Sequence, residues 1–144
     1  MIYGIEFPKK IALAYNTFCK PLCRELGLTQ TAFDILMFLG NNPCYKTAGE
    51  IVKLRHLKAN LVCINVNRLV DEGYLLKHRL EEDHRKTELI CTEKAQLIIK
   101  RGRQIQNSFF EKLFADTSEE TRRAFHEAMQ MIEKNLDSIL KAEI

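Results

Sequence analysis

The segment from Leu69 to Lys94 constrains the fold of this chain more than any other part of the sequence. Gly73 most readily adopts the left-handed conformation at which helices end. The residues after it extend as far as Asp83, where a charged tip reverses the chain, and residues 86–91 then return. A Thr-Glu-Lys element starts the next helix. The segment therefore predicts a helix end, a basic two-stranded wing and a new helix.

Three further helices are predicted ahead of the one that ends at Gly73. The first has Pro8 in its opening turn and ends at Gly27. The second begins at Thr29, a residue type that caps helix N-termini well. The third is short and begins at Thr47, with a glutamate three residues later in the capping-box relation. Short helices followed by a helix and a wing give the outline of a winged helix-turn-helix.

The helix before the wing, from about residue 58 to residue 72, has two different faces. Val62, Val66 and Leu69 recur at i, i+4 and i+7, so this face is predicted to be buried. The opposite face shows Asn60, Leu61, Ile64 and Arg68, with Asn65 and Asn67 at the flanks. Asparagine is a mediocre helix former, so three in one short helix indicate side chains chosen for hydrogen bonding. A merely solvated face would show the same pattern.

Two long amphipathic helices are predicted after the wing. One begins at Thr92, and the other is capped by the pair Thr117 and Glu120. The last helix carries one apolar stripe, made of Phe125, Met129, Ile132, Leu136 and Ile139. The apolar faces of the terminal helices exceed what a small helical unit can cover, so we expect a symmetric homodimer. The alternative is that the terminal helices cover one another within a single chain.

Composition fits one mostly helical domain over residues 1–144. The chain is 46% hydrophobic and has only 3 Pro and 6 Gly, which leaves room for one compact core and for no long linker. The net charge of +3 is too small to indicate a nucleic-acid partner by itself. Basic side chains nevertheless gather between Lys53 and Lys86, whereas carboxylates dominate after Glu111. The positive charge is therefore concentrated in the middle of the chain.

The cysteines and the absent motifs exclude several classes of protein. Five cysteines, with no apolar leader and no run of about 18 apolar residues, predict a cytoplasmic protein with reduced thiols and no membrane segment. Cys19 and Cys23 have no neighbouring His, so small buried residues are favoured over metal ligands. Phosphate loops, zinc-protease helices and nucleophile elbows do not occur. We expect no metal, no cofactor and no catalysis.

The order of these elements resembles the MarR family of winged helix-turn-helix transcriptional regulators over nearly the whole chain. The resemblance is carried by Leu28-Thr29, by Leu69 to Gly73, by Asp83 and Arg85, and by Thr92-Glu93-Lys94. Cys91 and Ala95 depart from the Leu and Gly that are common around the last of these elements. His84 stands where Arg is frequent in the wing. None of these departures removes the Asp83 and Arg85 pair.

The resemblance implies a mainly α fold with a two-stranded β wing. It assigns residues 29–91 to a winged helix-turn-helix that binds double-stranded DNA, and residues 1–27 and 92–144 to N- and C-terminal dimerisation helices. The fourth helix is then expected in the major groove and the wing in the adjacent minor groove. It further implies a homodimer that recognises a pseudo-palindromic operator and is released from it by a small-molecule effector.

Side chains of the fourth helix suit the reading of bases. Asn60 and Asn65 can donate to and accept from base edges, and Arg68 can form paired hydrogen bonds with guanine. Leu61 and Ile64 suit contact with thymine methyl groups. We therefore expect these five residues at the DNA.

The wing is expected to contribute one groove contact and several phosphate contacts. The planar cation of Arg85 suits a narrow, electronegative minor groove, and Asp83 is expected to hold it in a defined rotamer. An ordinary surface ion pair is the alternative explanation. Phosphate contacts, which position the protein without reading sequence, are expected from Lys53, Arg55, Lys58, Lys77, Arg79 and Lys86.

The signal that releases DNA is expected to be a small aromatic or lipophilic molecule, bound in a cleft beside the dimerisation helices. Tyr15, Phe18, Phe33 and Met37 are candidate lining residues, although they suit an ordinary core as well. Family members that sense hydroperoxides use a Cys near the start of the first helix, whereas Cys19 lies toward its end, so ligand sensing is favoured. Two other functions stay open: a winged-helix adaptor that binds a protein and no DNA, and a thiol-based redox sensor or enzyme.

Overall fold

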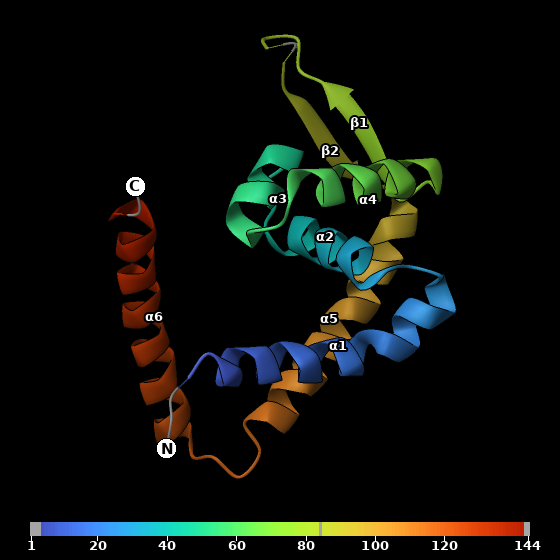
Figure 1. Cartoon of the computed structure of the whole chain (residues 1–144). Helices are drawn as coiled ribbons and strands as arrows, with labels where there is room; N and C mark the ends of the chain where they lie inside the picture. Colours follow the sequence, from blue (N-terminus) through green and yellow to red (C-terminus); the bar gives the residue numbers. More distant parts are fainter. Residues whose placement is uncertain (1–3, 84, 143–144) are drawn as a thin grey trace. The chain divides into compact units, whose positions relative to one another are not determined.

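The computed structural model describes residues 4–83 and 85–142, and it confirms the mainly α fold with a β wing (Figure 1). The elements among these residues are α1 (Glu6–Leu26), α2 (Gln30–Asn41), α3 (Ala48–Arg55), α4 (Ala59–Asp71), β1 (Leu75–Arg79), β2 (Thr87–Cys91), α5 (Glu93–Leu113) and α6 (Glu119–Ala142). None of the described helices is both long enough and apolar enough to span a bilayer.

The chain divides into two compact units, Met1–Phe109 and Phe110–Ile144. This boundary falls inside α5 and differs from the functional division predicted from the sequence. That division, with DNA binding at residues 29–91 and dimerisation at residues 1–27 and 92–144, stays a prediction.

Local signals set the ends of the first three helices. Gly27, at φ 66°, ends α1, and the hydroxyl of Thr29 caps α2 by accepting a hydrogen bond from the Ala32 N–H at 3.0 Å. Thr47 and Glu50 form the predicted capping box at the start of α3. These ends follow from backbone geometry and capping chemistry, which depend on only a few neighbouring residues.

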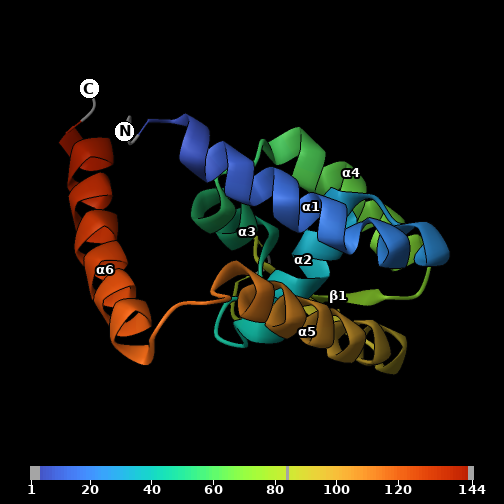
Figure 2. The same ribbon diagram turned by 90° about the horizontal axis from the view of Figure 1, so that it is seen from below.

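The core of the first unit lies where α1 to α5 and the wing meet. Its fully buried side chains come from every one of these elements: Cys19, Phe33, Ile35, Leu36, Ile51, Val62, Leu69, Leu75 and Ile99. Helices α1 and α5 are antiparallel neighbours, because Glu25 pairs with Arg101 near one end and the rings of Tyr15 and Phe109 meet edge to face near the other (Figure 2). The predicted buried stripe of α4 is confirmed, since Val62 and Leu69 are fully buried.

The wing is a two-stranded antiparallel sheet that extends beyond α4 (Figure 1). Gly73, at φ 81°, ends the helical segment as predicted, and Leu75 to Arg79 pair in order with Cys91 to Thr87. The Leu89 N–H donates to the carbonyl of Lys46 at 2.7 Å. This bond ties the second strand to the loop before α3.

The α6 helix forms as predicted, but its cap differs. Ser118, and not Thr117, accepts the hydrogen bond from the Thr121 N–H at 3.1 Å. Thr117 instead donates to the Phe114 carbonyl and accepts from the Arg122 guanidinium. Thr117 and Ser118 are adjacent and both carry a hydroxyl that suits a helix N-cap, but only the Ser118 hydroxyl lies at the capping position of α6. No described residue of α6 is buried.

Two of the four predicted effector residues belong to the core. Phe33 and Met37 are at most 2% exposed, and they pack so closely on α5 that a Cβ at Gly102 would overlap the Met37 sulfur and lie only 3.0 Å from Phe33 Cζ. The alternative interpretation, ordinary core, therefore applies to this pair. Tyr15 and Phe18 are half-buried against Phe109, at ring distances of 5.3 and 5.8 Å.

Candidate nucleic-acid interface

The outer side of α4 lies opposite its buried stripe. With about 100° of rotation per residue, Asn60, Ile64 and Asn67 fall together on this side. All three are exposed, and Ile64 shows 65% of its surface. Lys58 is the N-cap, and its side chain makes no capping hydrogen bond, as the sequence indicated. The outer side of α4 therefore presents two carboxamides and one apolar side chain to a partner. The first turn of the helix has no side-chain cap.

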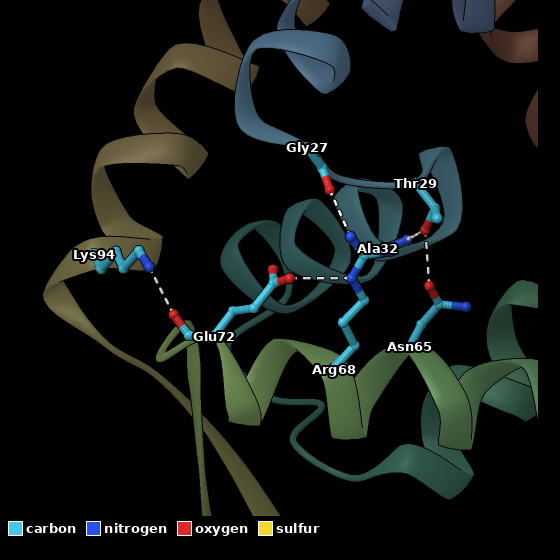
Figure 3. A network of polar contacts seen from close by, with 7 residues as sticks. All are labelled: Gly27, Thr29, Ala32, Asn65, Arg68, Glu72 and Lys94. Atoms are coloured by element: carbon cyan, nitrogen blue, oxygen red, sulfur yellow. Dashed lines mark hydrogen bonds and ion pairs between the residues drawn. The ribbon is translucent and has the colours of Figure 1, made fainter.

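Asn65 does not belong to this surface, which corrects the prediction that it contacts bases. Its side chain is 5% exposed and is aligned with the buried stripe. Its Oδ1 accepts from the Thr29 hydroxyl at 2.8 Å, and its Nδ2 donates to the Leu61 carbonyl at 2.9 Å. Asn65 therefore joins α4 to the cap of α2 (Figure 3). A buried carboxamide with its own partners is a structural group.

Arg68 lies on the flank of α4 that faces the junction of α1 and α2 (Figure 3). Its Nη2 donates to the Gly27 carbonyl at 2.8 Å, and its Nε pairs with Glu72 at 3.1 Å. Because both contacts are made within the protein, the structure favours a structural role for Arg68, which links α4 to the end of α1, over the predicted contact with guanine. Leu61, which is 39% exposed, lies on the same flank.

The Thr-Glu-Lys element after the wing holds the wing to the end of α4. The Thr92 hydroxyl donates to the Gly73 carbonyl at 2.7 Å. The Lys94 ammonium donates to the Glu72 carbonyl at 2.6 Å (Figure 3). It also lies 4.3 Å from the centre of the Tyr74 ring. These bonds satisfy carbonyls that α4 leaves open at its C-terminus. They connect two of the motifs on which the sequence resemblance rests.

The wing tip is shaped by Asp83 in a way that the sequence did not indicate. Its Oδ1 accepts from the backbone N–H of Arg85 at 3.0 Å, and its carbonyl accepts from the Lys86 N–H at 3.0 Å. No ion pair with the Arg85 guanidinium occurs among the described residues, so Asp83 fixes the turn and not the predicted rotamer. The Arg85 side chain is exposed. His84 lies outside the described residues.

Cations surround the outer side of α4. Two open grooves adjoin the wing, one of about 630 Å³ against the start of α3 and one of about 310 Å³ between α3, α4 and the strands. Lys53, Arg85 and Lys86 line the first groove, and Lys77 lines the second. Positive side chains beside an exposed helix face match a surface that binds phosphates.

Asn67 and Cys63 are surface residues that the predicted site did not include. The Lys77 ammonium donates to Asn67 Oδ1 at 2.7 Å, and Asn67 Nδ2 lies 3.6 Å from the Cys63 sulfur. Asn60, Ile64 and Asn67 recur at i, i+4 and i+7, so the helical period contained the signal. The sequence prediction placed Asn67 at the edge of the outer face because the middle of that face was taken to lie at Leu61 and Ile64.

The cysteine thiols differ in burial and in pKa. No group of three His, Cys, Asp or Glu residues in the described part of the chain could hold a metal ion. Burial raises the pKa of the Cys19 and Cys91 thiols and raises that of Cys23 to about 11. Cys44 and Cys63 are exposed. The two thiols on α1 are therefore protonated and poorly nucleophilic at neutral pH.

Sequence comparison identifies the relatives of this chain. Residues 26–86, which include α2, α3, α4 and β1, match the model of the MarR family. Over these residues the chain is similar to the MarR family. A curated relative, the HTH-type transcriptional regulator SarZ of Staphylococcus epidermidis, is 27% identical over 135 residues, or 92% of this chain and 86% of SarZ.

Solved structures share the fold of this chain. A MarR-family regulator from Listeria monocytogenes, solved in complex with 26mer DNA, has a TM-score of 0.87 at 15% identity and covers 100% of this chain and 98% of its own. A regulator from Methanosarcina mazei has a TM-score of 0.79 at 20% identity and covers 94% and 99%. The curated relative is a transcriptional regulator, and the Listeria monocytogenes structure is a complex with DNA.

Proposed function

We propose that this protein is a transcriptional regulator of the MarR type, which acts as a homodimer and binds a pseudo-palindromic operator. Each α4 helix enters a major groove with Asn60, Ile64 and Asn67 toward the bases, and each wing brings Arg85 to the adjacent minor groove. The observation that carries the proposal is the outer side of α4, where two carboxamides and an exposed isoleucine lie beside a cationic wing. Carboxamides suit base edges, and an apolar side chain suits a thymine methyl group.

The charges support DNA over a protein partner. Lys58, Lys77, Arg79 and Lys86 are all exposed around α4 and the wing, where they can neutralise phosphates on both sides of a groove. A winged-helix adaptor would have no need of this arrangement. The adaptor reading predicts no salt-sensitive complex with specific DNA, so the two functions are separable.

Binding to DNA fragments from around the gene tests this function. Arg85→Ala should weaken the specific complex while the thermal unfolding curve stays unchanged, because the side chain is exposed at the wing tip. Lys100→Ala is the matched control, since it removes an exposed cation from α5, outside the wing and α4. Arg79→Ala should weaken complexes with all sequences and reduce the slope of affinity against salt. Equal affinity of Arg85→Ala and wild type for the operator would refute the wing assignment.

The dimer is proposed from the apolar stripe of α6. Its residues are between 37% and 65% exposed: Phe125, Met129, Ile132, Leu136 and Ile139. The rings of Tyr15 and Phe18, on the first terminal helix, pack on Phe109 within the chain. The packing of α1 on α5 agrees in part with the single-chain alternative. We propose that the stripe of α6 packs on the partner copy. A stripe of this size on a soluble helix marks an interface.

Charge placed on the stripe tests the dimer. Leu136→Glu should give monomers in sedimentation at micromolar concentration, because a carboxylate would be buried in the interface. Lys134→Glu, about half a helical turn away, is the control and should stay dimeric. A wild-type chain that sediments as a monomer and still binds operator tightly would contradict the dimer.

Release by a small aromatic or lipophilic effector also belongs to the proposal. Phe18 and Ile105 line an open groove of about 450 Å³ between α1 and α5, and Tyr15 lies one turn of α1 away. The fluorescent aromatic anion anilinonaphthalene sulfonate is a suitable probe. It should bind the wild type more tightly than Phe18→Ala and should weaken the operator complex. Binding that leaves operator affinity unchanged would argue against an effector role. A cytoplasmic location follows from the proposed function, because the operator is there.

A further inference from the structure

Lys77 makes a contact with α4 that a lysine would not need if its only role were to contact a DNA phosphate. Its ammonium, on the first strand of the wing, donates to Asn67 Oδ1 at 2.7 Å. The two residues line one groove together with Cys63, whose sulfur lies 3.6 Å from Asn67 Nδ2. Lys77 is paired in register with Leu89, a buried residue, so its stem starts on the face of the wing that packs against the helices.

We propose that Asn67 reads a base and that Lys77 positions it. This inference rests on the proposed function and names one specificity-determining residue of the same surface. Asn67 is exposed on the outer side of α4, in line with Asn60 and Ile64. A free carboxamide can turn over and exchange its donor and acceptor ends at little cost. The charged hydrogen bond from Lys77 removes that ambiguity, because only the oxygen end accepts from an ammonium.

The orientation of Asn67 determines which base edge it fits. With Oδ1 held by Lys77, the amide nitrogen is the group offered to DNA, and it is a donor. In the major groove, guanine offers N7 and O6, adenine offers N7 and thymine offers O4 as acceptors, whereas cytosine offers a donor. Asn67 therefore favours guanine, adenine or thymine at the position it faces and disfavours cytosine. Lys77 acts through Asn67 and is a positioning residue.

Base preference, and not overall affinity, is the measurement that separates this role from a phosphate contact. Duplexes selected from a randomised library by the wild-type dimer define the preference at each position. Asn67→Ala should lose about tenfold discrimination at one position of each half-site and keep its affinity for random DNA. Lys77→Met, which keeps most of the stem and removes the donor, should lose discrimination at the same position. Lys77→Arg should restore most of it.

Two controls complete the test. Arg79→Met removes a neighbouring cation of the same strand and should lower affinity for all sequences without changing any preference. The double variant Asn67→Ala with Lys77→Met should discriminate no worse than Asn67→Ala alone, because both changes remove one interaction. Unchanged thermal unfolding curves show that each variant folds.

The inference is overturned if Asn67→Ala keeps the wild-type preference at every position, or if Lys77→Met behaves like Arg79→Met. A wild-type protein that forms no specific complex with any selected duplex overturns the proposed function, and this inference falls with it. A wild type that binds selectively with an unaltered preference in Asn67→Ala overturns the inference alone.

Discussion

Arg68 on α4 donates a hydrogen bond to the carbonyl oxygen of Gly27, which lies 41 positions earlier in the chain and 2.8 Å away. The carbonyl belongs to the left-handed residue that ends α1, and such a carbonyl has no partner within its own helix. The same guanidinium pairs with Glu72 at the end of α4. One side chain thus joins the ends of two helices, and the orientation of α4 depends on where α1 ends.

Arg68→Ala should therefore lower stability and leave base preference intact. We expect the free energy of unfolding in denaturant to fall by about 0.5–1.5 kcal/mol, since Arg68 is partly exposed and water replaces some of the lost bonds. Arg79→Ala, in the wing, is the control and should leave stability unchanged. A shift of preference at one operator position, with wild-type stability, would show that Arg68 reads DNA after all.

Asn65→Ala and Asn60→Ala form a matched pair on the same helix. Asn65→Ala should lower the free energy of unfolding by about 1–3 kcal/mol, because two buried hydrogen bonds disappear. Asn60→Ala should change it by less than about 0.5 kcal/mol and should relax base preference in the selection experiment. The opposite pattern, with a stable Asn65→Ala that loses specificity, would mean that the helix face is wrongly assigned.

Alkylation of Cys63 should block DNA binding. Cys63 is exposed on α4 near Asn67, so N-ethylmaleimide should attach a bulky group at the DNA-binding surface and abolish binding. Cys63→Ser should resist this treatment. Cys44→Ser should not, because Cys44 is exposed outside α4 and the wing. Persistent inhibition of Cys63→Ser would point to another thiol.

Peroxide should have little effect through the two thiols of α1. Cys19 and Cys23 are buried, and their raised pKa values leave little thiolate at neutral pH. Wild type and the double variant Cys19→Ser with Cys23→Ser should therefore hold operator equally well in stoichiometric peroxide. If peroxide released DNA from the wild type and not from the double variant, redox sensing would be favoured over ligand sensing.

Asp34 on α2 should make stability depend on pH. Burial raises the pKa of its carboxyl above the ordinary 3.8, although a hydrogen bond from Gln30 and the charge of Arg55 oppose the shift. As pH rises past 3.8, the unfolded chain releases this proton before the folded protein does. The contribution of Asp34 to stability therefore falls with rising pH until its folded-state pKa is passed.

Asp34→Asn removes this titration. It should raise the free energy of unfolding at pH 7 relative to the wild type and should approach the wild type at pH 3, where both side chains are neutral. Denaturant unfolding at the two pH values measures the difference. The prediction fails if the two proteins differ by the same amount at both pH values.

Helix ends and buried stripes were determined by the sequence alone. Gly27 and Gly73 end helices because glycine adopts positive φ without a steric penalty, and Thr29 caps α2 because its hydroxyl reaches a free N–H three residues away. Val62 and Leu69 are buried because they recur at the helical period. These effects act over one or two turns, so residues close in sequence suffice to predict them.

Tertiary packing decided which polar side chains face outward. Asn60, Asn65 and Asn67 are chemically alike, yet Asn65 accepts a hydrogen bond from Thr29, the capping residue of α2, while Asn67 accepts one from Lys77 of the wing. The sequence also could not show that Arg68 reaches Gly27, which lies 41 positions earlier. Each of these partners is chosen by distance and direction in space. The strength of a hydrogen bond falls steeply when the donor and acceptor move apart by a few tenths of an ångström. Helical periodicity predicts the direction of a side chain only approximately. The partner of each side chain is therefore known only from the folded structure.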